Sequence, residues 1–119
     1  DGYPELPDEN GQTLRETLAK AVALKTRMIQ IATWNDWGEG TQIEPSREFG
    51  YRDLTRIQRT RRQLESSFSP RELDLELPRQ LLSLRRTAEH PSETLDAIRA
   101  AILAGDLAQA RNQLQGFHH

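Results

Sequence analysis

The stretch MIQIATWNDWGEGTQIEP, residues 28–45, sets the expected fold of this chain. It begins with apolar residues at 28, 29, 31 and 32, a short run typical of a strand that is covered on both faces of a parallel sheet. Apolar residues at 14, 18, 21 and 22 precede it at helical spacing. Since a helix followed by a buried strand is half of an α/β unit, the pattern predicts a strand over 28–34 that needs partner strands.

Two helices are expected beside this strand. The first runs from Thr13 to about Leu24, and Thr13 with Glu16 matches the capping box that begins many helices. The second runs from about Tyr51 to Ser67, with apolar positions on one side and an outer face rich in arginine. We expect this arginine face to be solvated.

The C-terminal fifty residues are predicted to form helical hairpins. Charged and apolar residues alternate in ELDLEL, residues 72–77, as they do in a strand, but a helical turn or an extended linker is compatible with the same sequence. Helices are expected from Leu77-Pro78 to Ala88, from Ser92 to about Leu103, and after the N-cap Asp106, with Gly105 as a C′ residue. His90 is expected in a solvated loop, and His118 and His119 as remnants of a purification tag.

Composition excludes several classes of function. The 119 residues contain no cysteine, so disulfides and thiolate metal sites are ruled out. The net charge of −2, with 18 acidic residues against 16 basic ones, gives no general attraction to nucleic acid. No apolar run approaches the roughly 20 residues of a membrane span. We expect neither a nucleic-acid nor a membrane partner, and no cofactor.

The acidic loop after the predicted strand suggests chemistry. Asp36 and Glu39 are three residues apart, and a sharp bend at Gly38 and Gly40 would place both carboxylates on one side. Two such carboxylates are what glycoside hydrolysis requires. Nearby side chains would bind the sugar: Trp34 and Trp37 as flat walls, and Asn35 and Gln42 through hydrogen bonds to hydroxyl groups. Glu44 would bind a sugar hydroxyl or orient a neighbouring side chain. From spacing alone, an ordinary strand-ending turn remains the alternative, and the loop lacks the alternating ligands of a calcium site, so no metal is expected.

The longer string IQIATWNDWGEGTQIEPSREFGY, residues 29–51, resembles the last barrel strand and following loop of glycoside hydrolase family 71 and 99-like proteins. The resemblance covers about residues 1–68 and implies part of a (β/α)8 barrel. It also implies that Glu39 is the general acid/base and Asp36 its partner, acting on α-linked glucans, mannans or related oligosaccharides. Asp at position 36 follows the family 71-like pattern rather than the Glu of family 99, which argues against assuming endo-α-mannosidase specificity.

These observations predict an α/β fragment that resembles the last helix-strand-helix part of a TIM barrel (residues 1–68), followed by an all-α helical extension (69–119). The chain is expected to be mainly helical overall. A complete barrel needs roughly 250 residues, so most of the sugar pocket would be absent. We therefore expect a parent glycoside hydrolase and an inactive isolated chain. The alternative is a noncatalytic helical interaction module or barrel remnant that self-associates as a homodimer, because an unpaired hydrophobic strand invites pairing.

Overall fold

The computed structural model describes residues 4–87 and 92–117, and it divides into two compact units, Asp1–Leu64 and Glu65–His119. Ala88, His90 and the two terminal histidines, for which the sequence made predictions, lie outside the described residues.

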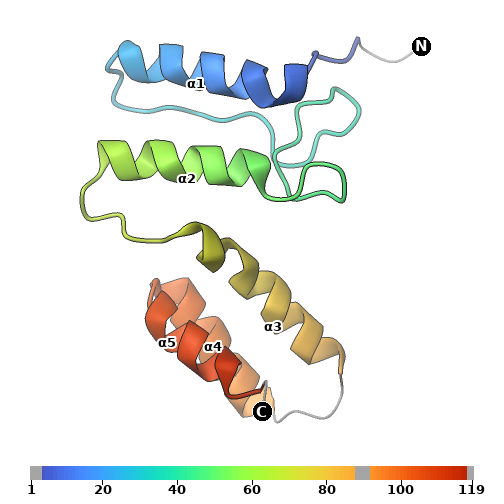
Figure 1. The fold of residues 1–119 in the computed structure, drawn as a ribbon, viewed down its shortest axis with the longest axis vertical. Helices are drawn as coiled ribbons and strands as arrows, with labels where there is room; N and C mark the ends of the chain where they lie inside the picture. The colour runs from blue at the N-terminus through green and yellow to red at the C-terminus, as the bar shows by residue number, and fades with distance from the viewer. Residues whose placement is uncertain (1–3, 88–91, 118–119) are drawn as a thin grey trace. The chain divides into compact units, whose positions relative to one another are not determined.

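The first unit contains two α-helices joined by a long irregular segment. A 3₁₀ turn, η1 (Glu9–Gly11), leads into α1 (Gln12–Ala23), and the second helix is α2 (Arg52–Leu64). The chain leaves the end of α1, returns in an extended path, and makes its loops before α2 begins (Figure 1). Both helices consequently run in the same direction, with their N-terminal ends on the same side of the unit.

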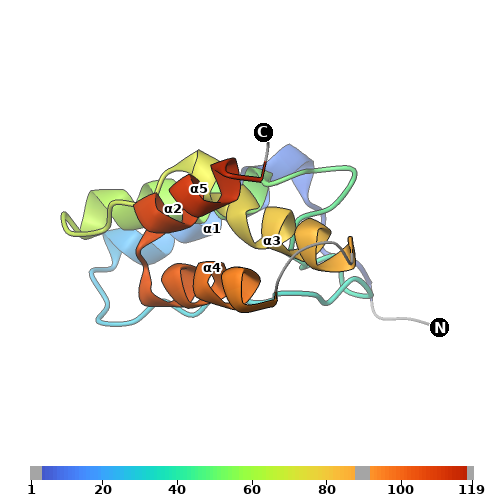
Figure 2. The same cartoon turned by 90° about the horizontal axis from the view of Figure 1, so that it is seen from below.

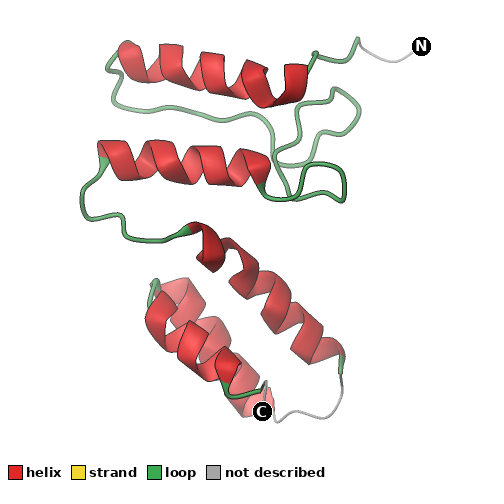
Figure 3. Ribbon diagram, in the orientation of Figure 1, coloured by secondary structure: helices red, strands yellow, loops and turns green. Residues whose placement is uncertain are grey.

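The predicted strand over 28–34 is wrong, and with it the predicted α/β class. The described residues form helices, turns and loops, with only an isolated antiparallel bridge between Ser46 and Gly50 (Figure 3). Within the described part of the chain, the backbone N–H groups of residues 29–32 have no hydrogen-bond partner. Met28 is 81% exposed. An apolar run becomes a strand only when neighbouring chain supplies a ladder of hydrogen bonds, and within the described residues such bonds reach only Thr33 and Trp34, at the end of this run.

The expected capping box at the start of α1 also proved wrong. The Thr13 hydroxyl donates to the carbonyl of Pro7 at 2.6 Å, and the Glu16 carboxylate accepts from the side chain of Gln12 at 2.5 Å. The N-cap position is taken by Gly11, whose φ of +82° is readily accessible only to glycine. The turn before the helix therefore sets where α1 begins.

The second unit is the helical assembly that the sequence predicted. Residues 72–76 form a 3₁₀ turn, η2 (Glu72–Glu76), followed by α3 (Leu77–Arg86), α4 (Ser92–Ala104) and α5 (Leu107–Gln115), as Figure 2 shows. Asp106 caps α5 by accepting from the backbone N–H of Gln109 at 3.2 Å, and Gly105 has a φ of +78°. Both roles were predicted.

The helical-turn reading of ELDLEL is the one the structure adopts, and Asp74 explains it. One oxygen of this buried carboxylate accepts from the backbone N–H of Arg71 at 2.8 Å, while the other pairs with Arg111 of α5. Pro78 lies in the first turn of α3, where its missing N–H costs nothing. These contacts favour a turn that leads directly into a helix.

Apolar burial differs between the two units. The core cluster lies entirely in the second unit, on one face each of α3, α4 and α5, and Ile98 and Ala110 at its centre are fully buried. Among the described apolar side chains of the first unit, only Leu18 is buried, with 7% of its surface exposed. Local hydrogen bonds and ion pairs must therefore contribute much of the order of the first unit.

Candidate functional site

The acidic loop predicted to carry the chemistry is closed at its base by two threonines. The N–H of Thr33 donates to the carbonyl of Thr41 at 3.0 Å, and the N–H of Ile43 donates to the carbonyl of Thr33 at 3.0 Å. The two threonine hydroxyls lie 2.9 Å apart. These bonds join the chain entering the loop to the chain leaving it, so residues 33–43 form a defined turn.

Asp36 organises the inside of this turn. Its Oδ1 accepts from the N–H of Glu39 at 3.1 Å, the side-chain-to-backbone bond by which Asp commonly stabilises turns. The N–H of Asp36 donates to the hydroxyl of Thr33 at 3.0 Å, and its carbonyl accepts from the N–H of Thr41 at 3.2 Å. The Asp36 carboxylate is thus held in place, with one oxygen used by the turn.

Glu39 lies at the far side of the turn, and only its backbone is engaged. Its carbonyl accepts from the N–H of Leu6 at 2.9 Å, which ties the loop to the N-terminal segment. Gly40 follows with a φ of +71°, and a Cβ there would lie 3.4 Å from the carbonyl oxygen of Leu6. Among the described residues, no group forms a hydrogen bond or ion pair with the half-buried Glu39 carboxylate, which leaves it available to a ligand.

Both tryptophans expose about half of their surface, 52% for Trp34 and 49% for Trp37. The indole N–H of Trp37 donates to Oε1 of Glu44, so that carboxylate fixes the ring. The carbonyl of Trp34 accepts from the N–H groups of Ile43 and Glu44, at 3.1 and 2.9 Å. Exposed aromatic rings with a polar handle are suited to stacking against a ligand.

Asn35 and Gln42, also predicted to bind sugar, are placed differently from each other. Asn35 is exposed, and its carbonyl accepts from the N–H of Trp37 at 3.1 Å. Gln42 lines a separate cavity of about 220 Å³ together with α1 residues such as Thr13 and Thr17. Its Oε1 is buried there without a hydrogen-bond partner in the described structure. The cavity that holds Gln42 does not include the two catalytic candidates or the tryptophans.

An ion-pair network that the sequence did not predict joins the N-terminal loop to α2. Arg52 forms a two-point contact with Asp8, at 3.1 Å from Nη1 and 2.7 Å from Nη2, and its Nε lies 3.0 Å from Asp53. The guanidinium also stacks on the ring of Phe49, 4.1 Å from its centroid. The hydrogen bond to Asp53, with a smaller effect of Asp8, raises the pKa of Arg52 above its ordinary value.

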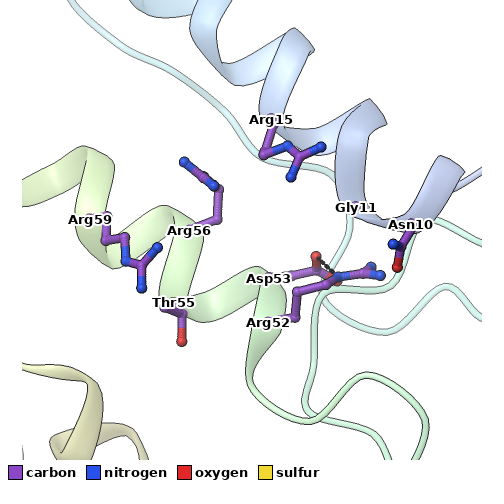
Figure 4. Close-up of a pocket in the computed structure, with 8 residues that line it drawn as sticks. All are labelled: Asn10, Gly11, Arg15, Arg52, Asp53, Thr55, Arg56 and Arg59. Atoms are coloured by element: carbon purple, nitrogen blue, oxygen red, sulfur yellow. Dashed lines mark hydrogen bonds and ion pairs between the residues drawn. The ribbon is translucent and has the colours of Figure 1, made fainter.

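A second unpredicted feature is a cavity of about 240 Å³ between α1 and α2, shown in Figure 4. Its wall contains four arginines, Arg15, Arg52, Arg56 and Arg59. The sequence showed three of them at helical spacing on one face of α2, but their approach to Arg15 depends on how two helices distant in sequence lie.

No group of three or more metal-ligating side chains occurs among the residues that the structure describes. Likewise, no helix in that part of the chain is long and apolar enough to cross a membrane.

Comparison with known proteins gives one family. Residues 5–57 match the model of the family described as Glycosyltransferase WbsX. No curated protein and no solved structure matches the chain. The matched segment contains the whole acidic loop and its ties to Leu6, and it also includes the Arg52 network. The N-terminal part of the chain is therefore similar to a carbohydrate-active family, which agrees in coarse terms with the resemblance seen in the sequence.

Proposed function

We propose that residues 5–57 carry part of a site that binds an α-linked oligosaccharide and processes its glycosidic bond. The observation behind this proposal is the carboxylate of Glu39, which has no partner among the described residues, in a loop inside the segment similar to a carbohydrate-active family. The two half-exposed tryptophans of the same loop support it.

The two carboxylates have different surroundings, which suits different roles. Asp36 is held by the turn and keeps one oxygen outside it, so it can orient water or bind a sugar hydroxyl in a fixed position. Glu39 is free to exchange a proton with the glycosidic oxygen, the task of a general acid/base. Trp34 and Trp37 would carry the sugar rings, with Trp37 kept in position by Glu44.

A second candidate is glycosyl transfer, which the description of the matched family favours. The same Glu39 carboxylate would then remove a proton from a sugar hydroxyl of the acceptor, where hydrolysis would use water. The two reactions share the loop and differ in the nucleophile. A reaction run with and without an added acceptor sugar distinguishes them by whether the product carries the acceptor.

Binding is tested first, by titrating the full chain with α-linked glucose or mannose oligosaccharides while recording tryptophan fluorescence. We expect a saturable change that a β-linked glucose oligosaccharide of the same length does not produce. Trp34→Leu, which keeps Trp37 as a reporter, should weaken binding. No saturable change with any α-linked oligosaccharide would refute the proposed site.

Turnover is tested with the same sugars and the variant Glu39→Gln. Loss of a general acid/base lowers the rate by about 10²–10⁴-fold, whereas the matched control Glu48→Gln, an exposed glutamate of the same unit, should leave it unchanged. Equal rates for the two variants would refute the role of Glu39. Binding without turnover in the unaltered chain would favour the noncatalytic module.

A further inference from the structure

The cavity between α1 and α2 has an excess of positive charge on its walls. Of its eight lining residues, four are arginines and only Asp53 is acidic. Asp53 is already bonded to Arg52, at 3.0 Å from Nε and 3.2 Å from Nη2. The single carboxylate in the wall is therefore committed to one of the four guanidinium groups.

Of the four arginines in the cavity wall, Arg15 and Arg56 are the ones for which the described part of the chain supplies no acidic partner. Arg15 extends from α1 and Arg56 from α2, both into the space between the helices (Figure 4). Within the described residues, neither side chain forms a hydrogen bond or an ion pair. Arg59, one turn beyond Arg56 on the same helix, lines the same cavity. Guanidinium groups brought toward one cavity repel each other, and a bound anion would reverse that repulsion.

The wall of this cavity is fixed on one side. Arg52 is held by Asp8, Asp53 and the ring of Phe49, and its Nε would lie 2.9 Å from a Cβ at position 11. Gly11 therefore allows α1 to begin directly against Arg52. This close approach joins the N-cap of α1 to the first residue of α2, the two helices that carry Arg15 and Arg56.

From this arrangement we infer that the cavity binds a phosphate group, held by Arg15 and Arg56 with Arg59 beside them. A guanidinium group can donate two parallel hydrogen bonds to two oxygens of one phosphate group. A phosphate monoester also carries about −1.5 to −2 charges at neutral pH, enough to compensate two guanidinium groups. A carboxylate has one negative charge and two coplanar oxygens, so it suits a single guanidinium group rather than donors from two helices. The volume of about 240 Å³ lies below the range of about 300–1,000 Å³ usual for drug-sized ligands. The bound part is thus the phosphate group of a larger molecule or a small inorganic phosphate.

This site stands on residues separate from the acidic loop and does not depend on the proposed sugar chemistry. It is tested by isothermal titration calorimetry of the full chain with inorganic pyrophosphate at low ionic strength. NMR chemical shifts of the arginine side chains are followed during the same titration. We expect saturable binding that Arg15→Gln and Arg56→Gln each weaken by about tenfold or more. Arg15→Lys should weaken it less than Arg15→Gln, because lysine keeps the positive charge and loses only the paired N–H donors.

The matched control is Arg47→Gln, which removes the same charge from an exposed position of the same unit outside the cavity. It should bind pyrophosphate as the unaltered chain does. Equal weakening by Arg47→Gln and Arg56→Gln would overturn the inference, because the attraction would then be nonspecific. Absence of saturable binding to pyrophosphate and to lipid phosphate would overturn it as well.

A second arm identifies the source of the phosphate. The chain is sedimented with phosphatidylcholine vesicles that contain phosphatidic acid, and with phosphatidylcholine alone as the control. Vesicle binding that Arg56→Gln abolishes, with no binding of soluble pyrophosphate, assigns the cavity to a lipid headgroup. Binding of pyrophosphate alone assigns it to a soluble phosphate compound, and either result supports the phosphate chemistry.

Discussion

Replacing Gly11 by alanine should destabilise the first unit through two separable effects. The backbone at this position has a φ of +82°, which costs an L-residue about 1–2 kcal/mol. In addition, the new Cβ would lie 2.9 Å from Nε of Arg52, and 3.2 Å from its Cδ and Cζ. Since the guanidinium is held by Asp8 and Asp53, it must give up part of those contacts in order to move.

The second effect can be estimated from the contacts that would be lost. A hydrogen bond to a charged group contributes about 1.5–3 kcal/mol, and partial exposure lowers this value. The side chains of Arg52 and Asp8 are 26% and 38% exposed, so we take about 1 kcal/mol for the disturbed pair. Gly11→Ala should therefore cost about 2–3 kcal/mol in total.

Gly50 offers a matched control in the same unit. Its φ is +56°, and a Cβ added there would have no atom within 4 Å, so Gly50→Ala should cost only the backbone strain of about 1–2 kcal/mol. The difference between the two alanine variants isolates the contact with Arg52.

Urea unfolding followed by tryptophan fluorescence measures these costs, because Trp34 and Trp37 both report on the first unit. A double-mutant cycle with Arg52→Ala completes the test. In the Arg52→Ala background the clash is removed, and Gly11→Ala should cost about 1 kcal/mol less than in the unaltered chain. If Gly11→Ala has the same cost in both backgrounds, the proposed contact between Gly11 and Arg52 has no energetic role.

Three further predictions concern packing, capping and the acidic loop. Ile98→Ala, at a fully buried position, should cost about 2–5 kcal/mol in a far-UV circular-dichroism denaturation, whereas Leu103→Ala, at a side chain that is 69% exposed, should cost little; similar costs would contradict the assigned core. Asp106→Ala should cost about 1 kcal/mol by the same measurement, since it removes the cap of α5, and an unchanged midpoint would exclude that cap. Glu44→Leu should speed hydrogen exchange of the Trp37 indole N–H measured by NMR, and an unchanged rate would show that the bond between them does not persist in solution.

The helices of the second unit were predictable because their signals are local. Apolar residues at helical spacing in α4 and α5, the N-cap Asp106 and the positive-φ Gly105 all act within a few residues of each other along the chain. The exact ends were less well predicted: α3 ends at Arg86 instead of Ala88. Terminal turns depend on caps and neighbours beyond the apolar pattern.

The predicted strand failed for the opposite reason. The apolar side chains at 28, 29, 31 and 32 favour an extended backbone. A sheet, however, requires hydrogen bonds with backbone segments that are distant in sequence. At the start of α1, Thr13 and Glu16 satisfied the spacing of a capping box, yet the carbonyl of Pro7 and the side chain of Gln12 became their partners. The predicted strand lacked partners and the capping residues found other ones, so in both places residues outside the local pattern decided the outcome.

The sequence by itself determined where most of the helices form, and it predicted the acidic loop as the segment that carries candidate catalytic side chains. It also located Asp36, Glu39 and the two tryptophans in one short turn, because residues so close along the chain cannot lie far apart. Only the tertiary structure showed that Asp36 is bonded to the turn, while the Glu39 carboxylate has no described partner. It alone brought Asp8 to Arg52, and Arg15 to the cavity shared with Arg56. The contact of Asp8 with Arg52 joins residues 44 positions apart, and both it and the shared cavity exist only after α1 and α2 have taken their places in the same unit.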